Sequence, residues 1–248
     1  MNLRFDILYE YRYMFLHGAL TTLWLTAVSV VIGMVLGLFG ALGRLAHSEK
    51  GGAPVQILLW MIRQVTLAYV TFFRGTPLFV QIFIWYFVWF AAMINPTDGW
   101  LISGEAAVTI RQQYGVLIAG ILALSVNAGA YMTEIFRAGI QSIDKGQVEA
   151  ARSLGLSYKQ TMRHIVLPQA MRRMLPPFGN EFITLLKDSS LLSAIAVAEL
   201  AFVARTISGR YFIYESPYYA VAFIYLIMTV ALTWFFSWLE KRYNSETR

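Results

Sequence analysis

Long apolar runs separated by short polar segments restrict the fold of this chain more than any other feature of its sequence. The first run covers 16–45 and exceeds the about 20 residues that a helix needs to cross the hydrocarbon core of a bilayer. Four further runs follow, at 77–93, 114–136, 178–202 and 217–239. We interpret each run as one span, so the sequence predicts an all-α integral membrane protein with five transmembrane helices.

The low content of charged residues agrees with a membrane protein. These residues make up 14% of the chain, whereas a typical soluble domain has about 25%. Lysine and arginine are concentrated at 44–50, 137–173 and 241–248, and the loops 95–113 and 205–216 carry three between them. Because cytoplasmic loops of membrane proteins are enriched in these residues, the N-terminus is expected outside and the C-terminus inside. This distribution explains the net charge of +6 better than nucleic-acid binding does.

The segment 1–16 mixes charged and aromatic residues and precedes the first span. It lacks the basic start, apolar centre and small-residue cleavage site of a signal peptide. We interpret it as an interfacial segment anchored by aromatic side chains, and 1–248 as a single transmembrane domain.

The apolar stretch 53–92 is too long for one span. Arg63 interrupts its first half, and the Arg-Gly-Thr-Pro sequence at 74–77 divides it, because glycine and proline interrupt helices. We expect 55–73 to be a partly embedded helix and 77–93 to be the second span.

Glycines recur along the first span. Gly33 and Gly37 form a G-x-x-x-G pair, which Gly40 and Gly43 extend, and such a pattern lets another helix approach closely. Packing within the chain is the preferred interpretation, and dimerisation is the alternative.

Several classes of site lack support in the sequence. The chain has no cysteine, which excludes disulfides, iron–sulfur clusters and thiolate zinc sites. Its histidines, His17, His47 and His164, are far apart and lack metal-ligand spacing. No lysine lies in a phosphate-binding loop, and no nucleophile–base pair is recognisable. We therefore expect no enzyme activity, metal or cofactor in this chain, and any ATPase would be a separate subunit.

One polar and basic segment, 146–177, separates two apolar runs. Its first part has a helix-favouring composition and stops at Gly155, a typical residue just beyond a helix C-terminus. Ser157 precedes Gln160 by three positions, which is the spacing of a capping box that begins a second helix. The sequence therefore predicts a helix, a glycine turn and another helix. Three prolines are expected to kink or end the second helix: Pro168, Pro176 and Pro177.

The same segment resembles the EAA loop of ABC importer permeases, which forms a coupling helix that docks into a groove on a cytoplasmic ATPase subunit. The match comprises Glu149-Ala150-Ala151, then Gly155, and then Ile165, Leu167 and Pro168. The resemblance implies that the alanines permit close approach, that the glycine makes the turn, and that Glu149 offers a carboxylate to the partner. The residues implied in coupling are Glu149, Ala150, Ala151, Arg152, Gly155, Leu156, Ile165, Leu167 and Pro168. The alternative is an ordinary cytoplasmic helical hairpin.

Three further segments are similar to those of polar amino-acid permeases in this superfamily. One is Arg74-Gly75-Thr76-Pro77-Leu78 followed by Gln81, which structurally is simply a helix break. The others are 130–140 and 180–191, on either side of the EAA loop. With the EAA pattern, they make the chain similar to the histidine-, glutamine- and arginine-type permeases.

The fourth span carries many polar groups, and ionisable groups inside a membrane usually face a cavity or pair with one another. One alternative to a substrate path is that Lys187 and Asp188 pair with groups on other helices. Another is that Glu134 forms a local pair with Arg137 and that Asn127 serves helix packing. The candidates for the substrate path are Arg74, Thr76, Gln81, Asn127, Glu134, Glu181, Lys187, Asp188, Ser189 and Ser190.

The resemblance implies a membrane-spanning permease subunit of an ATP-driven importer for polar amino acids, in the bacterial cytoplasmic (inner) membrane. Its implied partners are an ABC ATPase dimer that holds the ATP and magnesium, a second permease subunit, identical or paralogous, an extracytoplasmic amino-acid-binding protein and membrane lipid. The loop 95–113 is a candidate contact for the binding protein. The alternative is an ATP-independent transporter or channel subunit, which leaves the EAA spacing unexplained. Charges of both signs leave the transported amino acid open.

Overall fold

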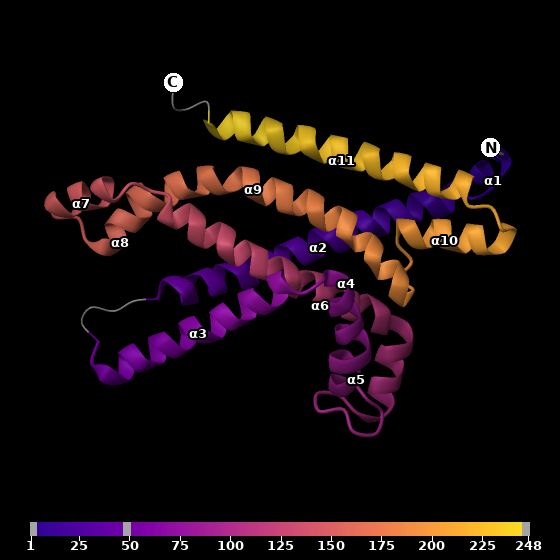
Figure 1. Ribbon diagram of the computed structural model, residues 1–248, viewed down its shortest axis with the longest axis horizontal. Coiled ribbons are helices and arrows are strands. Elements are labelled where there is room, and N and C mark those ends of the chain that lie inside the picture. The colour runs from indigo at the N-terminus through magenta and orange to yellow at the C-terminus, as the bar shows by residue number, and fades with distance from the viewer. Residues whose placement is uncertain (1–3, 47–50, 245–248) are drawn as a thin grey trace.

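A computed structural model describes residues 4–46 and 51–244, and helices make up most of this length (Figure 1). The all-α membrane fold predicted from the sequence is confirmed. Part of the predicted inner turn, including His47, lies outside the described residues. The α-helices are α1 (Phe5–Glu10), α2 (Arg12–Leu45), α3 (Ala53–Gly75), α4 (Leu78–Phe83), α5 (Phe90–Met93), α6 (Gly104–Gln141), α7 (Lys145–Ser153), α8 (Tyr158–Thr161), α9 (Leu167–Asp188), α10 (Leu200–Tyr211) and α11 (Glu215–Asn244). Two π-helical segments, Ile84–Trp89 and Met162–Val166, and a 3-10 helix, Ser189–Ile195, connect some of them.

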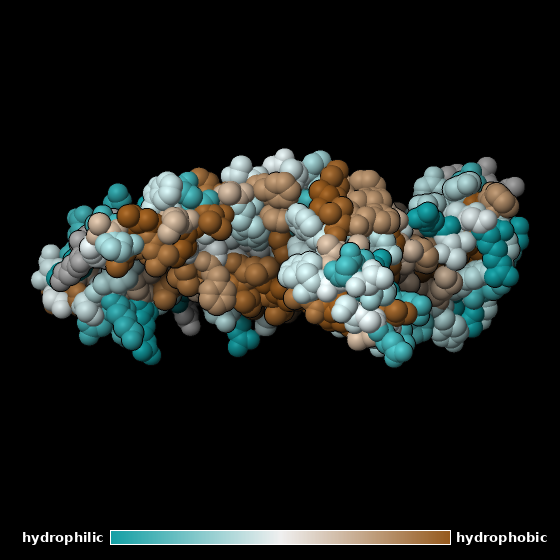
Figure 2. Space-filling model, turned by 90° about the horizontal axis from the view of Figure 1, so that it is seen from below, coloured by the Kyte–Doolittle hydropathy of each residue, from teal (hydrophilic) through white to brown (hydrophobic). Residues whose placement is uncertain are grey.

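The helices lie along one long axis. α2, α3, α9, α11 and the second part of α6 follow this axis, whereas α4, α5 and the first part of α6 project to one side (Figure 1). α7 and α8 lie at one end of the axis, and α1 and α10 lie at the other. Hydrophobic residues gather along the middle of the molecule and hydrophilic ones at both ends (Figure 2). This is the distribution expected of helices that cross an apolar layer.

Within the described residues, up to five segments have the length and hydropathy of membrane spans. Four are single helices, α2, α3, α6 and α11. The fifth is a bent pair in which Tyr158–Ile195 and Leu200–Tyr211 meet at 42°. When the bent pair is counted as one span, the resulting five spans leave the two chain ends on opposite sides, as the basic loops predict.

The second span differs from the one predicted. α3 is a continuous helix of 23 residues with the hydropathy of a span, whereas Leu78–Met93 is a shorter apolar helix. Arg63 lies exposed on α3 without interrupting it. At 1.5 Å per residue, the shorter helix reaches only about 24 Å, which is less than the about 30 Å of the hydrocarbon core. The second span is therefore α3, not 77–93.

Several predicted boundaries also differ. α6 begins within the predicted loop 95–113, and α10 occupies much of the predicted loop 205–216. The predicted span 178–202 is divided, because α9 gives way to the 3-10 helix and α10 follows a sharp bend. α9 continues through Pro176 and Pro177 and is not ended by them. The two prolines inside α9 therefore do not shorten it.

A buried carboxylate holds the bend before α10. Glu199 is fully buried and accepts hydrogen bonds from two backbone N–H groups in the first turn of α10, at 2.7 and 2.8 Å. It also accepts one from the Tyr225 hydroxyl on α11, at 2.9 Å. Thr22 on α2 accepts a hydrogen bond from the backbone N–H of Leu200 at 3.2 Å. The bend therefore brings α10 together with α11, the next helix, and with α2, which is distant in sequence.

The glycines of α2 allow close packing, as the sequence predicts. A Cβ atom on Gly33 would lie 2.9 Å from the Cβ of Ala128, and one on Gly37 would collide with Met132. Both neighbours belong to α6. Packing within the chain is therefore the use of this pattern that the structure shows.

We expect Gly37→Val to lower the unfolding temperature of the detergent-solubilised protein, because overpacking costs about 1–3 kcal/mol. Gly209→Val is the matched control, since a Cβ atom on Gly209 would meet open space. Thermal unfolding followed by circular dichroism measures both variants. Equal losses in the two would contradict a close α2–α6 contact at Gly37.

Candidate functional site

The helix, glycine turn and second helix predicted within 146–177 are present. α7 ends at a Schellman-type turn in which Gly155 has a φ of 84°. The backbone N–H groups of Gly155 and Leu156 donate hydrogen bonds to carbonyls in the last turn of α7, at 3.0 and 3.1 Å. α8 begins with a capping box formed by Ser157 and Gln160. The sequence predicted both motifs because their hydrogen-bond partners lie within a few positions of one another.

The predicted coupling residues fall on both the exposed and the buried side of this segment. Glu149 and Ala150 are exposed on α7, but Ala151 is 3% exposed and packs against the protein itself. Only Ala150 is therefore available for the close approach that was predicted for both alanines. The other predicted coupling residues are exposed or half-buried: Arg152, Gly155, Leu156, Ile165, Leu167 and Pro168.

Contacts attach this helical segment to α9. Val166, Ala170 and Met174 form a buried cluster with Ile143, at the end of α6. Gln169 on α9 donates a hydrogen bond from Nε2 to Oε1 of Gln147 on α7 at 2.7 Å. α7 is therefore joined to α9 by one side-chain hydrogen bond, and the segments that flank α7 are joined to α9 by the buried cluster.

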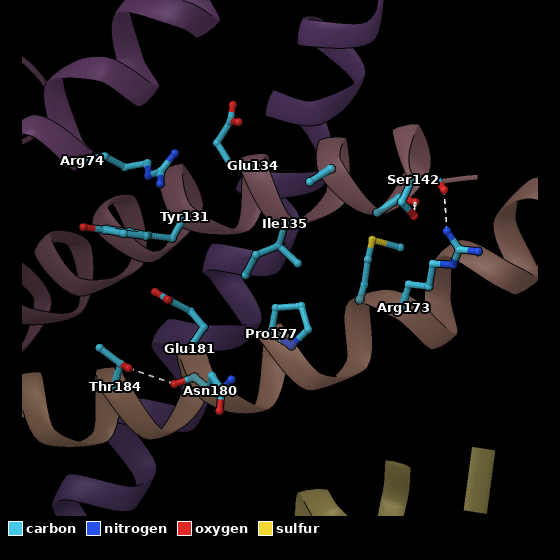
Figure 3. A pocket seen from close by; sticks show the side chains of 13 residues that line it. Arg74, Tyr131, Glu134, Ile135, Ser142, Arg173, Pro177, Asn180, Glu181 and Thr184 are labelled. Atoms are coloured by element: carbon cyan, nitrogen blue, oxygen red, sulfur yellow. Dashed lines mark hydrogen bonds between the residues drawn. The ribbon is translucent and has the colours of Figure 1, made fainter. Parts of the chain in front are cut away.

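A cavity of about 550 Å³ lies further along α9, between this helix, α6 and the end of α3 (Figure 3). Its size is in the usual range for small-molecule sites. Charged and polar side chains from the three helices converge on it. The lining residues are Arg74, Tyr131, Glu134, Ile135, Ala138, Gly139, Ser142, Arg173, Met174, Pro177, Asn180, Glu181 and Thr184.

Opposite charges lie on either side of an aromatic ring in this cavity. The guanidinium carbon of Arg74 is 5.1 Å from the centre of the Tyr131 ring, which is a cation–π distance. The Glu181 side chain extends from α9 toward Tyr131 (Figure 3). Among the described residues, the Glu181 carboxylate has no hydrogen bond or ion pair, so its oxygens remain available to a ligand. Arg74 and Glu181 were both predicted as candidates for the substrate path.

Glu134, in contrast to Glu181, forms hydrogen bonds and ion pairs with neighbouring arginines. Arg137 donates two hydrogen bonds to its Oε2 atom, at 2.6 and 3.0 Å, so the local pair considered in the sequence analysis is present. Nε of Arg44 lies 3.8 Å from Oε1 of the same carboxylate. This is an ion-pair distance but is too long for a hydrogen bond. Glu134 thus lines the cavity with much of its charge balanced by two arginines.

Three other candidates lie at the break between α3 and α4. Pro77 has no N–H, so the carbonyl of Phe73 lacks its helical donor. The side-chain amides of Gln81 and Asn127 donate to this carbonyl at 2.9 and 3.1 Å. Asn127 also donates to Oε1 of Gln81 at 2.9 Å. Thr76 contributes its carbonyl and hydroxyl oxygens as further acceptors for Gln81.

The remaining candidates follow Glu181 along the chain but do not line the cavity. Lys187 is exposed and Asp188 is half-buried at the end of α9. Ser189 is fully buried and donates a hydrogen bond to the carbonyl of Leu186 at 2.7 Å. Ser190 is half-buried in the same 3-10 helix. The structure therefore gathers Arg74, Glu134 and Glu181 and leaves these four outside.

Sequence reasoning missed several residues that shape the cavity. Tyr131 and Asn180 stand within segments that carried the resemblance, but neither is among the candidates for the substrate path. Arg173 was counted as one basic residue of a loop, although its guanidinium donates a hydrogen bond to the carbonyl of Ser142 at the edge of the cavity. Arg44 lies 90 positions from Glu134, and no local signal connects them.

Comparison with known proteins gives consistent results. Residues 57–245 match the family model described as "Binding-protein-dependent transport system inner membrane component". The chain is 38% identical over 222 residues to the "Probable amino-acid ABC transporter permease protein YckA" of Bacillus subtilis (strain 168), covering 90% of this chain and 85% of that protein. It is 35% identical to the "Glutamine transport system permease protein GlnP" of Escherichia coli (strain K12), covering 92% and 91%.

A solved structure is similar over the whole length. It is described as "Crystal structure of an amino acid ABC transporter with histidines", and it matches with a TM-score of 0.79 and 35% identity. The match covers 98% of this chain and 100% of the chain in that structure. The fold is therefore common to this chain and the chain in that structure.

Proposed function

The chain belongs to the family of binding-protein-dependent transport system inner membrane components, and from this premise we propose that it is the permease subunit of an ATP-driven importer for polar amino acids. The relatives named above are amino-acid permeases by description. We place it, as a multi-pass protein, in the bacterial inner membrane. In this proposal an ABC ATPase dimer binds α7 from the cytoplasm, a second permease subunit completes the path, and a binding protein delivers the substrate from outside.

The observation that carries the proposal is that α9 connects two sites. At its beginning, it is attached to α7 by the buried cluster around Val166 and by the hydrogen bond between Gln169 and Gln147. Further along, it carries Glu181 into the cavity. A movement of α7 caused by an ATPase would therefore change the position of Glu181 relative to α6.

The cavity suits an amino acid because every amino acid carries a carboxylate and an ammonium group on one carbon. Arg74 offers a guanidinium group, which pairs well with a carboxylate. Glu181 offers acceptor oxygens for the ammonium group, on the other side of Tyr131. Glu134, balanced by Arg137 and Arg44, contributes little net charge. We propose that Arg74 and Glu181 together bind the part common to all amino acids.

The experiment is reconstitution of the chain in proteoliposomes with its ATPase and binding protein, followed by assays of ATP hydrolysis and amino-acid uptake. We expect both activities to require all three components and to be stimulated by one or more polar amino acids. The alternative, an ATP-independent transporter or channel, predicts uptake down a gradient by this chain alone. Uptake without the ATPase would therefore overturn the proposal.

A further inference from the structure

The backbone on either side of Arg74 is held by one buried side chain. Gln81, on α4, is 1% exposed, and its Nε2 atom donates a hydrogen bond to the carbonyl of Phe73 at 2.9 Å. The same atom donates to the carbonyl of Thr76 at 3.0 Å. These two carbonyls lie just before and just after the Arg74–Gly75 dipeptide. The Gln81 amide therefore restricts the direction in which the Arg74 side chain leaves the end of α3.

Two consecutive turns of α6 contact the same place. Asn127 is 5% exposed, and its Nδ2 atom donates to the Phe73 carbonyl at 3.1 Å and to Oε1 of Gln81 at 2.9 Å. Tyr131 follows Asn127 by four positions and therefore lies on the same face of α6. The guanidinium carbon of Arg74 lies 5.1 Å from the centre of the Tyr131 ring (Figure 3). One face of α6 thus contacts both the backbone beside Arg74 and its charged group.

Little else holds Arg74. The residue is exposed, and among the described residues its guanidinium group has no hydrogen bond or ion pair. Gly75 adds no packing, since a Cβ atom there would meet nothing within 4 Å. The place of the guanidinium group therefore depends on the Tyr131 ring and on the amides of Gln81 and Asn127.

This amide network is larger than the break in the helix requires. The Phe73 carbonyl lacks one helical donor, because Pro77 has no N–H. Two amides nevertheless donate to it, and Gln81 also donates to Thr76 beyond the break. Satisfying one carbonyl does not account for all these hydrogen bonds, whereas fixing the backbone around Arg74 does.

We propose that Gln81 and Asn127 are positioning residues, which hold the Arg74 guanidinium in place for the carboxylate of a transported amino acid. The proposal rests on the function proposed above, in which Arg74 binds that carboxylate. The two amides do not contact the substrate and act only through Arg74. The alternative is that they support the fold and have no particular relation to Arg74.

The first test measures the contact between Arg74 and Tyr131 without transport. Fluorotyrosine is incorporated at Tyr131 alone in the full chain, and its fluorine NMR signal is recorded in detergent. Arg74→Gln is expected to shift this signal, because it removes the cation from the face of the ring. We expect Gln81→Met to shift the signal in the same direction, since the guanidinium group then leaves the ring.

The second test measures amino-acid uptake in proteoliposomes that contain the ATPase and the binding protein. We expect Gln81→Met to reduce kcat/KM by about fivefold in the wild-type chain but by less than about twofold in the Arg74→Gln background, because nothing is then left to position. Thr22→Val is the matched control. It removes a buried acceptor, which binds the backbone N–H of Leu200 at 3.2 Å and does not line the cavity. Its effect should be equal in both backgrounds, and the fluorine signal should not move.

Two results would overturn the positioning role. One is a fluorine signal that stays at the wild-type position in Gln81→Met, and the other is an equal loss of uptake in the two backgrounds. If Gln81→Met does not fold, Asn127→Leu removes the other amide and carries the same expectations. Wild-type uptake by Arg74→Gln would instead count against the amino-acid site itself, and the fluorine signal distinguishes this failure from the first.

Discussion

Glu149→Lys is expected to reduce substrate-stimulated ATP hydrolysis by the reconstituted complex by about 30-fold or more. The carboxylate is exposed on α7, and neither the glycine turn, the capping box of α8 nor the buried side of Ala151 depends on it. The substitution is therefore expected to change the proposed docking surface and to leave the fold intact. Removing one partner of a desolvated charge pair at an interface costs about 2–5 kcal/mol, and reversing its charge adds repulsion. The hydrolysis rate and co-purification of the ATPase measure the effect.

Glu10→Lys is the control for this prediction, because Glu10 is exposed at the end of α1, in the N-terminal segment that is predicted to lie outside. It makes the same change of charge in a part of the chain that is not expected to contact the ATPase. We expect Glu10→Lys to retain most of the stimulated hydrolysis. If Glu149→Lys also retains stimulated hydrolysis and uptake, α7 is not the coupling helix.

Arg74→Gln and Glu181→Gln are each expected to reduce amino-acid uptake, measured as kcat/KM, by about 10- to 100-fold. Each variant leaves one charge of the bound amino acid without its partner, and a hydrogen bond to a charged group contributes about 1.5–3 kcal/mol. Both side chains line the cavity, and among the described residues neither holds another helix in place through an ion pair. The loss should therefore appear in uptake and not in thermal stability.

Arg63→Gln is the matched control for Arg74→Gln, since Arg63 lies on the same helix, is exposed and does not line the cavity. It should transport at nearly the wild-type rate. Wild-type uptake by both cavity variants would exclude Arg74 and Glu181 as the ligands of the amino acid, while leaving the importer assignment to the reconstitution experiment.

The sequence predicted the structure best where hydrogen-bond partners lie within a few positions of one another. Gly155 and Ser157 predicted the turn and the capping box because their partners lie within a few positions. The glycine pattern of α2 predicted a close helix contact, although it did not identify α6 as the partner. The family resemblance ordered these local elements along the chain.

Features that depend on distant contacts could not be predicted. Gln81 was a candidate for the substrate path through the segment that resembles other permeases, and Asn127 was a candidate with helix packing as its alternative. The sequence did not indicate that both amides donate to a carbonyl that Pro77 leaves without a donor. Glu199 was not among the candidates, although its carboxylate caps α10 and accepts a hydrogen bond from Tyr225 on α11. The sequence shows where polar side chains occur, but it does not show which distant backbone groups they hydrogen-bond.

The break at Pro77 also has a consequence for the biogenesis of the chain. Its amide network is completed by Asn127, which follows Phe73 by 54 positions. α3 and α4 are therefore synthesised before the last donor of the network. Of the two amides, Gln81 comes first in the chain, and the network is complete only when α6 has packed against α3 and α4. The packing of a later helix is thus needed before this break has all its hydrogen bonds.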